Sequence, residues 1–227
     1  MNIVNQEQTM TLIKQGFMLI ITLFVLAGCN DSKLQKVLQE GFDSSNPTGK
    51  TGICFTVGVV DYPYTSIEVT GEPDQWGELY PVVANRKLNK RLALFSQLGL
   101  LSEQPVVDKD GKPTGFYHYD LTELGKKYRY YHNDDQVFCF GRMVVDAITK
   151  KREETSNLGK VLSVDYRYHI EGEIPQWATS PLLNQYRFLS RKNEPIDWSK
   201  QLDNQRFDKR QDKLYSQVPI RSKIIGY

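Results

Sequence analysis

The chain has 227 residues, of which 40% are hydrophobic, 25% charged and 11% aromatic. This composition is too apolar for a disordered chain and too interrupted by charge for a protein that crosses a membrane many times. The formal net charge of +2 at pH 7 gives no reason to expect nucleic acid as a partner.

The first distinctive element is an uncharged stretch of 14 residues from Gln15 to Gly28. It is shorter than the about 20 residues that a helix needs to span the hydrocarbon core of a bilayer, and it fits the apolar region of a signal peptide. The stretch leads into Leu26-Ala27-Gly28-Cys29, which resembles the lipobox of bacterial lipoproteins.

The resemblance implies that residues 1–28 are a signal peptide and that Cys29 receives a diacylglycerol and an acyl chain such as palmitate. Asn30 follows, whereas the family associates Asp at that place with the inner membrane, so the resemblance implies an outer-membrane lipoprotein that faces the periplasm. Translation begins either at Met1 or at Met10, which would give a 19-residue signal. The alternative is a buried helix that ends in a cysteine by chance.

Residues 29–50 are expected to form the lipidated N-terminus and a tether. Within them, Leu34, Val37, Leu38 and Phe42 have the spacing of a short amphipathic helix. The polar segment over 43–49 contains Pro and Gly and predicts a loop that lifts the domain off the membrane.

The domain itself is expected over residues 51–189. Apolar and β-branched runs predict strands over 53–60, 137–148 and 162–170. Two further extended runs, on either side of Asp110-Gly111, predict a hairpin.

The clearest predicted helix covers 84–100, because Leu88, Leu92 and Phe95 recur at helical spacing between basic residues. Shorter helical segments are predicted over 122–128 and 181–189. Residues 190–227 are mostly polar and are expected to form a C-terminal extension along the surface.

Strands and helices do not alternate as βαβ units, which predicts an α+β fold: a single domain with a mainly antiparallel sheet and a few amphipathic helices.

The stretch from Leu88 to Tyr128 resembles a winged-helix module. In that family a helix ends near a sequence such as Gly99-Leu100-Leu101, a β wing follows, and a turn such as Leu121-Thr122-Glu123-Leu124-Gly125 opens the next element. Because a signal peptide takes the domain away from chromosomal DNA, the resemblance implies a winged-helix-like substructure for packing or protein contact.

Residues 85–130 hold nine Lys+Arg and five Asp+Glu. Such an excess is typical of a surface that meets an anionic partner, although a solvated helix face is the alternative. The candidate binding surface consists of Arg86, Lys87, Lys90, Arg91, Lys126 and Lys127.

Two of the three cysteines, Cys54 and Cys139, lie in predicted strands. A disulfide between them is expected, because the periplasm permits disulfides. Two reduced core cysteines are the alternative. A metal site is not expected, because the chain has no CxxC pair and neither cysteine has a histidine at ligand spacing.

The sequence has no GxSxG, SxxK, P-loop or dinucleotide-binding motif, so no catalytic residue and no cofactor is predicted. We therefore expect a non-enzymatic envelope lipoprotein that binds the bilayer through Cys29 and another envelope protein through its domain. One alternative is an enzyme that acts on peptidoglycan or another envelope substrate, with His118 and Asp120 on one strand face. Another is a resistance or immunity lipoprotein that sequesters a ligand.

Overall fold

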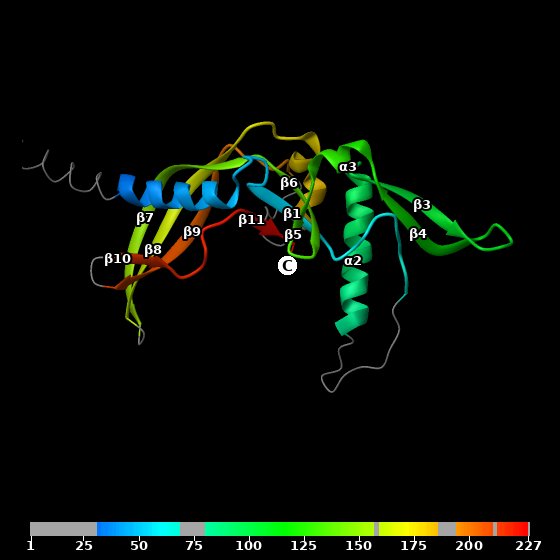
Figure 1. Ribbon diagram of the computed structural model, residues 1–227, viewed down its shortest axis with the longest axis horizontal. Coiled ribbons are helices and arrows are strands. Elements are labelled where there is room, and N and C mark those ends of the chain that lie inside the picture. Colours follow the sequence, from blue (N-terminus) through cyan, green and yellow to red (C-terminus); the bar gives the residue numbers. More distant parts are fainter. Residues whose placement is uncertain (1–30, 69–79, 157–158, 186–193, 211–212, 227) are drawn as a thin grey trace, which may run out of the picture. The chain divides into compact units, whose positions relative to one another are not determined.

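The computed structural model describes residues 31–68, 80–156, 159–185, 194–210 and 213–226 (Figure 1). These residues form helices and three mainly antiparallel sheets, which confirms the predicted α+β class. The chain folds as two compact units. Unit 1 takes residues up to Phe42, Val144–Tyr168 and Leu202–Ile220, and unit 2 takes Asp43–Met143, His169–Gln201 and Arg221–Tyr227.

Unit 1 contains most of a helix over residues 31–45, which we call the N-terminal helix, and a four-stranded sheet. The strand order is β10-β9-β8-β7, so that β7 is an edge strand. The bounds are β7 Arg142–Ser156, β8 Gly159–Glu171, β9 Gln201–Arg210 and β10 Lys213–Ser216. The clean alternation that predicted a strand over 162–170 is confirmed by β8.

The N-terminal helix packs into unit 1 through one apolar stripe. Leu34, Leu38 and Phe42 recur every four residues and are at most 5% exposed. The Phe42 ring lies 6.0 Å from the ring of Tyr166 on β8. Four-residue spacing places these side chains on one face of the helix. Residues 31–45 are therefore built into the fold, and the short amphipathic helix predicted from Leu34, Val37, Leu38 and Phe42 is present.

Side chains of the same helix also pair with the free edge of β7. Gln35 Nε2 donates to the Val145 carbonyl oxygen at 2.7 Å, and the Val145 backbone N–H donates to Gln39 Oε1 at 2.9 Å. Asp31 forms an ion pair with Lys151. The two glutamines satisfy backbone groups that an edge strand would otherwise leave exposed to other chains.

Unit 2 is built around a sheet with the strand order β11-β1-β6-β5. Its strands are β1 Ile53–Gly58, β5 Arg129–His132, β6 Asp135–Phe140 and β11 Lys223–Ile225. Helix α2, Tyr80–Gln97, contributes Phe95, whose ring lies 5.0 Å from that of Phe138 on β6. Trp177 and Trp198 pack their rings edge-on against Phe140. These aromatic rings form the core of unit 2.

The strand predicted over 137–148 is two strands, β6 and β7, separated by Gly141. Gly141 has a φ of 64°, and a Cβ atom there would lie only 2.2 Å from Cγ2 of Ile170. A larger residue would therefore meet both backbone strain and a steric clash. The apolar pattern continues across the break, so hydrophobicity alone predicts one long strand.

A third sheet, of order β2-β4-β3, contains the predicted hairpin. Its bounds are β2 Tyr64–Thr65, β3 Leu101–Val107 and β4 Pro113–Leu121. Helix α3, Glu123–Tyr128, follows, with the Thr122 hydroxyl accepting from the Gly125 N–H at 3.0 Å. The winged-helix resemblance is not confirmed, because α3 has only six residues and runs directly into β5.

The C-terminal segment differs from the expected surface extension. It supplies β9, β10 and β11, and it buries Trp198 and Phe207 to 2% and 1% exposure. The short helix predicted over 181–189 is a 3-10 helix, Pro181–Gln185, preceded by another at Gln176–Thr179; residues 186–189 lie outside the described residues. In the described ranges no helix has the length and apolarity to cross a membrane.

Candidate functional site

Cys29, the predicted lipid attachment site, lies outside the described residues, which begin two positions later at Asp31. The described element nearest to Cys29 in the sequence is the N-terminal helix. Its first described residue is fixed to β7 by the ion pair between Asp31 and Lys151. The described part of the chain thus starts on a packed element.

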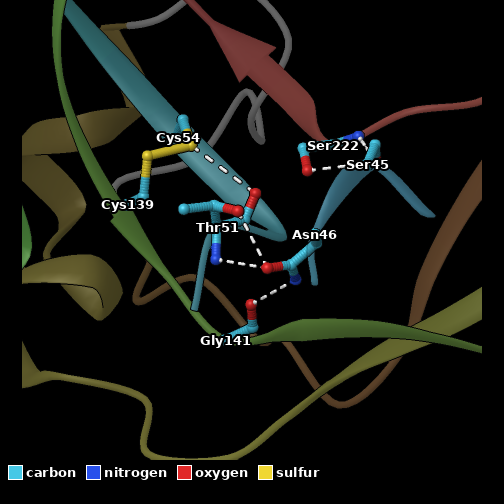
Figure 2. The surroundings of a disulfide bond; sticks show 7 residues. All are labelled: Ser45, Asn46, Thr51, Cys54, Cys139, Gly141 and Ser222. Carbon is cyan, nitrogen blue, oxygen red and sulfur yellow. Dashed lines mark hydrogen bonds between the residues drawn. A yellow bond between two sulfur atoms is a disulfide. The ribbon is translucent and has the colours of Figure 1, made fainter. Parts of the chain in front are cut away.

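The predicted disulfide is confirmed. Cys54 on β1 and Cys139 on β6 are direct cross-strand partners, and their sulfur atoms are bonded at 2.04 Å (Figure 2). Both are almost fully buried, beside Val137. The bridge joins residues 85 positions apart, for which the chain-entropy model gives about 4–5 kcal/mol of stabilisation.

A polar cluster fastens the loop before β1 beside the disulfide, as Figure 2 shows. Asn46 Oδ1 accepts from the Thr51 N–H at 2.9 Å and from the Thr51 hydroxyl at 2.8 Å, and Asn46 Nδ2 donates to the Gly141 carbonyl at 3.2 Å. The Ser222 N–H donates to Ser45 Oγ at 2.8 Å. Asn46 is only 5% exposed, so its hydrogen bonds offset the cost of burying an amide. The cluster holds backbone segments together and presents no reactive group.

The candidate basic surface on α2 keeps three of its four predicted members. Arg86, Lys87 and Lys90 are exposed. Arg91 is half-buried, and its guanidinium donates to the Val57 carbonyl oxygen at 3.2 Å. Arg91 therefore joins α2 to β1, and the exposed positive charge of the helix comes from the other three residues.

The two predicted lysines of α3 are paired with carboxylates. Lys126 Nζ lies 2.6 Å from Glu123, and Lys127 Nζ lies 3.0 Å from Glu173. The hydrogen bond to Glu123 raises the pKa of Lys126 above its ordinary value. Because both pairs are exposed, each contributes little to stability, but each reduces the positive charge that α3 offers.

The six predicted basic residues lie on two helices, α2 and α3. The start of α3 contacts the chain just after α2, where the Thr122 N–H donates to the Leu100 carbonyl at 3.2 Å. Arg86, Lys87 and Lys90 are exposed, whereas Arg91 is bonded to the Val57 carbonyl and the two lysines of α3 are paired with carboxylates. The candidate surface thus reduces to Arg86, Lys87 and Lys90, which we call the α2 basic face.

His118 and Asp120 do not interact in the way that a base and its orienting carboxylate would. Both are exposed on β4. The Nδ1 atom of His118 is 2.7 Å from the Thr65 hydroxyl, and Asp120 Oδ1 accepts from the Leu121 N–H at 2.7 Å. The carboxylate is therefore engaged by the backbone, while the imidazole pairs with a hydroxyl.

Sequence reasoning missed a polar cluster at the edge of the sheet in unit 2. Arg129 Nε donates to Gln136 Oε1 at 2.7 Å, and the Arg129 guanidinium lies 4.7 Å from the ring centre of Tyr131 and 5.8 Å from that of Tyr62. Burial holds the pKa of Tyr62 well above its ordinary value. Arg129 and Tyr131 are alternate residues of β5 and Gln136 lies on the neighbouring β6, while Tyr62 comes from the segment between β1 and β2. No local motif reveals this arrangement.

Two other kinds of site bear on function, a metal centre and a small-molecule pocket. No group of three or more His, Cys, Asp and Glu side chains in the described residues is arranged to hold a metal ion. A hollow of about 520 Å³ in unit 1 is wide open to solvent, and its exposed lining is mostly apolar; it is formed by Thr149, Lys150, Asp165, Leu202, Asp203 and Asn204. Small-molecule sites usually enclose most of their ligand, whereas this hollow is open to solvent.

Comparisons with models of protein families, with curated proteins and with solved structures found no match to this chain.

Proposed function

We propose that this chain is a lipoprotein of the bacterial envelope, held in the outer membrane by acylated Cys29, whose folded part is a non-enzymatic binding module facing the periplasm. The observation that carries the proposal is the order of residues from 15 to 29: an apolar stretch too short to span a bilayer, small residues, and then the cysteine. An acylated cysteine of this kind anchors a protein durably, because each buried methylene contributes about 0.8 kcal/mol.

The disulfide supports the proposed compartment. Disulfides persist in oxidising environments such as the bacterial periplasm and are rare in the cytosol. The chain has three cysteines, and the bridge uses Cys54 and Cys139. Cys29 is then the one thiol left for acylation, as a lipobox requires.

The α2 basic face supports a binding role. Within the described residues, Arg86, Lys87 and Lys90 are exposed and form no ion pair with a carboxylate, unlike Lys126 and Lys127. Unpaired cations on one helix face attract an acidic surface and increase its rate of association. The partner proposed for this face is an envelope protein that presents carboxylates.

The anchor is tested by fractionation of the native chain beside a Cys29→Ala variant, in which membrane location is expected to be lost.

The binding role is tested by crosslinking in cells, which identifies partners of the native chain. The same crosslinking is then repeated with an Arg86→Glu/Lys87→Glu/Lys90→Glu variant. This variant should no longer crosslink to the partner of the native chain. A matched Lys109→Glu/Lys112→Glu variant, altered in the exposed turn between β3 and β4, should keep it. Loss of the partner in both variants, or in neither, would contradict the assignment to the α2 basic face.

An envelope enzyme and a ligand-sequestering lipoprotein remain alternatives, and no contact in the described residues favours either. The enzyme alternative predicts that folded His118→Ala or Asp120→Ala variants lose function in an envelope assay. Unchanged function in both variants supports the binding module.

A further inference from the structure

The connection between the proposed anchor and the folded domain is very short. Asn30 alone separates Cys29 from the N-terminal helix as described from Asp31. Two fully extended residues span about 7 Å. If Cys29 carries acyl chains, the first described turn of the helix lies within about that distance of the bilayer surface.

The N-terminal helix cannot act as a flexible spacer, because it is fixed along its length in unit 1. Leu34 and Leu38 are at most 2% exposed. Gln35 and Gln39 pair with both backbone groups of Val145, and Asp31 pairs with Lys151. Lifting unit 1 away from the anchor would expose these apolar side chains and break these contacts.

The part of unit 1 next to the helix start is basic. Lys33 and Lys36 are exposed on the helix, where Lys36 lies 3.8 Å from Glu40, which is also exposed. Lys150 on β7 is exposed, directly precedes Lys151, the partner of Asp31, and lines an open hollow that also contains Asp165 and Asp203. Residues 149–160 hold four Lys+Arg and two Glu, and residues 206–213 hold four Lys+Arg and two Asp. The ion pair of 2.8 Å between Lys209 and Glu153 shows that these two segments lie side by side.

We propose that unit 1 rests directly on the membrane and that Lys33, Lys36 and Lys150, which we call the anchor-side lysines, bind the headgroups of anionic phospholipids. The proposal rests on the proposed acylation of Cys29. It follows from the short connection and the sign of the nearby charge, because a lysine close to an anionic surface gains about 1 kcal/mol and the attraction fades within about 10 Å. The anchor and the lysines then act together, so that the lipid sets both the position and the orientation of unit 1.

The test uses the native acylated chain in vesicles of two compositions. One contains phosphatidylethanolamine with phosphatidylglycerol, and the other contains phosphatidylcholine alone. An amine-reactive reagent labels exposed lysines, and mass spectrometry of the digested chain measures the label at each position. Labelling of Lys33 and Lys150 should be about fivefold lower in the anionic vesicles, the change that corresponds to about 1 kcal/mol per lysine. Equal labelling of these lysines in both vesicles would overturn the proposal.

Intact mass, recorded on the same sample, distinguishes a failure of the proposed acylation from a failure of the proposed membrane contact. A chain without acyl groups overturns the proposed lipoprotein function. An acylated chain whose anchor-side lysines are labelled equally in both vesicles overturns only the membrane contact.

A linker variant tests the role of the short connection. Insertion of a long Gly-Ser segment between Asn30 and Asp31 should raise labelling of Lys33 and Lys150 in anionic vesicles to near the level in neutral vesicles. A Gly-Ser segment of the same length in the turn at Gly111, on the exposed β3–β4 hairpin of unit 2, is the matched control and should leave the protection intact. Unchanged protection in the first variant would contradict the role of the short connection.

Discussion

The backbone N–H of Val145 donates to Gln39 Oε1 at 2.9 Å, so that a helix side chain occupies the hydrogen-bonding position of a missing neighbouring strand. Gln35, one turn earlier, donates to the carbonyl of the same residue. The N-terminal helix thus both covers the sheet of unit 1 and closes part of its edge. Because this helix follows the proposed lipid attachment site, its fixation would couple the proposed anchor to unit 1.

Replacing Gln35 and Gln39 together by Ala should lower the free energy of unfolding by about 2–4 kcal/mol, since a buried backbone donor and acceptor lose their partners. Urea unfolding measures the change. Lys36→Ala, on the same helix but 75% exposed at its side chain, should change stability by less than about 0.5 kcal/mol. Similar losses in the two variants would contradict a specific role of the glutamines.

Removing the disulfide as Cys54→Ala/Cys139→Ala should lower the free energy of unfolding by about 2–5 kcal/mol, because the unfolded chain regains the freedom of a long loop. Chemical denaturation of the variant beside the native chain tests this. A reducing agent should weaken the native chain and leave the double variant unchanged. If the reducing agent does not affect the native chain, the bridge does not contribute as proposed.

Gly141→Ala should be among the most destabilising single substitutions in unit 2, with a loss of more than about 2 kcal/mol. The added methyl group would enter the space of Ile170, and the φ of 64° adds backbone strain. Gly49 is a matched control, because its φ of 68° imposes a similar strain while nothing lies within 4 Å of a Cβ atom there. Gly49→Ala should therefore cost about 1 kcal/mol. Equal losses of stability in Gly141→Ala and Gly49→Ala would show that the close approach to Ile170 does not add to the cost of the substitution.

The ion pair between Lys127 and Glu173 predicts a small pH dependence of stability. The hydrogen bond from Lys127 lowers the pKa of Glu173 below its ordinary value. A carboxyl group with a lowered folded-state pKa contributes stability at neutral pH, and this is lost as the pH falls through that pKa. Between about pH 6 and about pH 3, the native chain should therefore lose more stability than a Glu173→Gln variant. Parallel urea unfolding curves measure the difference, and identical pH dependence would contradict the assignment.

Local signals in the sequence were sufficient for elements whose residues carry their own pattern. The alternation over 162–170 predicted β8, and the recurrence of Leu88, Leu92 and Phe95 predicted α2. Cys54 and Cys139 were paired because each lay in an apolar run and only one other cysteine exists. For β8 and α2 a short window contains both the residues and the spacing that determine the element, whereas the disulfide, which joins residues 85 positions apart, was predicted from the number of cysteines and the apolar run around each.

The features that were missed depend on residues distant in the sequence. The break between β6 and β7 occurs at Gly141, where Ile170 approaches the backbone closely. Lys127 forms an ion pair with Glu173, which is 46 positions away in the sequence. Among the described side chains of β9 and β10, only Phe207 is buried. Most other positions of these strands face solvent and are polar, so their hydrophobic periodicity is weak. The Gln35 and Gln39 contacts with Val145 likewise join residues more than 100 positions apart.

Intact mass of the natively expressed chain, with mass spectrometry of the peptide that contains Cys29, tests the central claim most directly. The account predicts a mature chain that begins at Cys29, carries a diacylglycerol on the thiol and an acyl group on the new amino terminus, and loses its membrane location in the Cys29→Ala variant. A full-length chain with an unmodified Cys29 in the soluble fraction would contradict the account, and with it the proposed contact of unit 1 with the membrane.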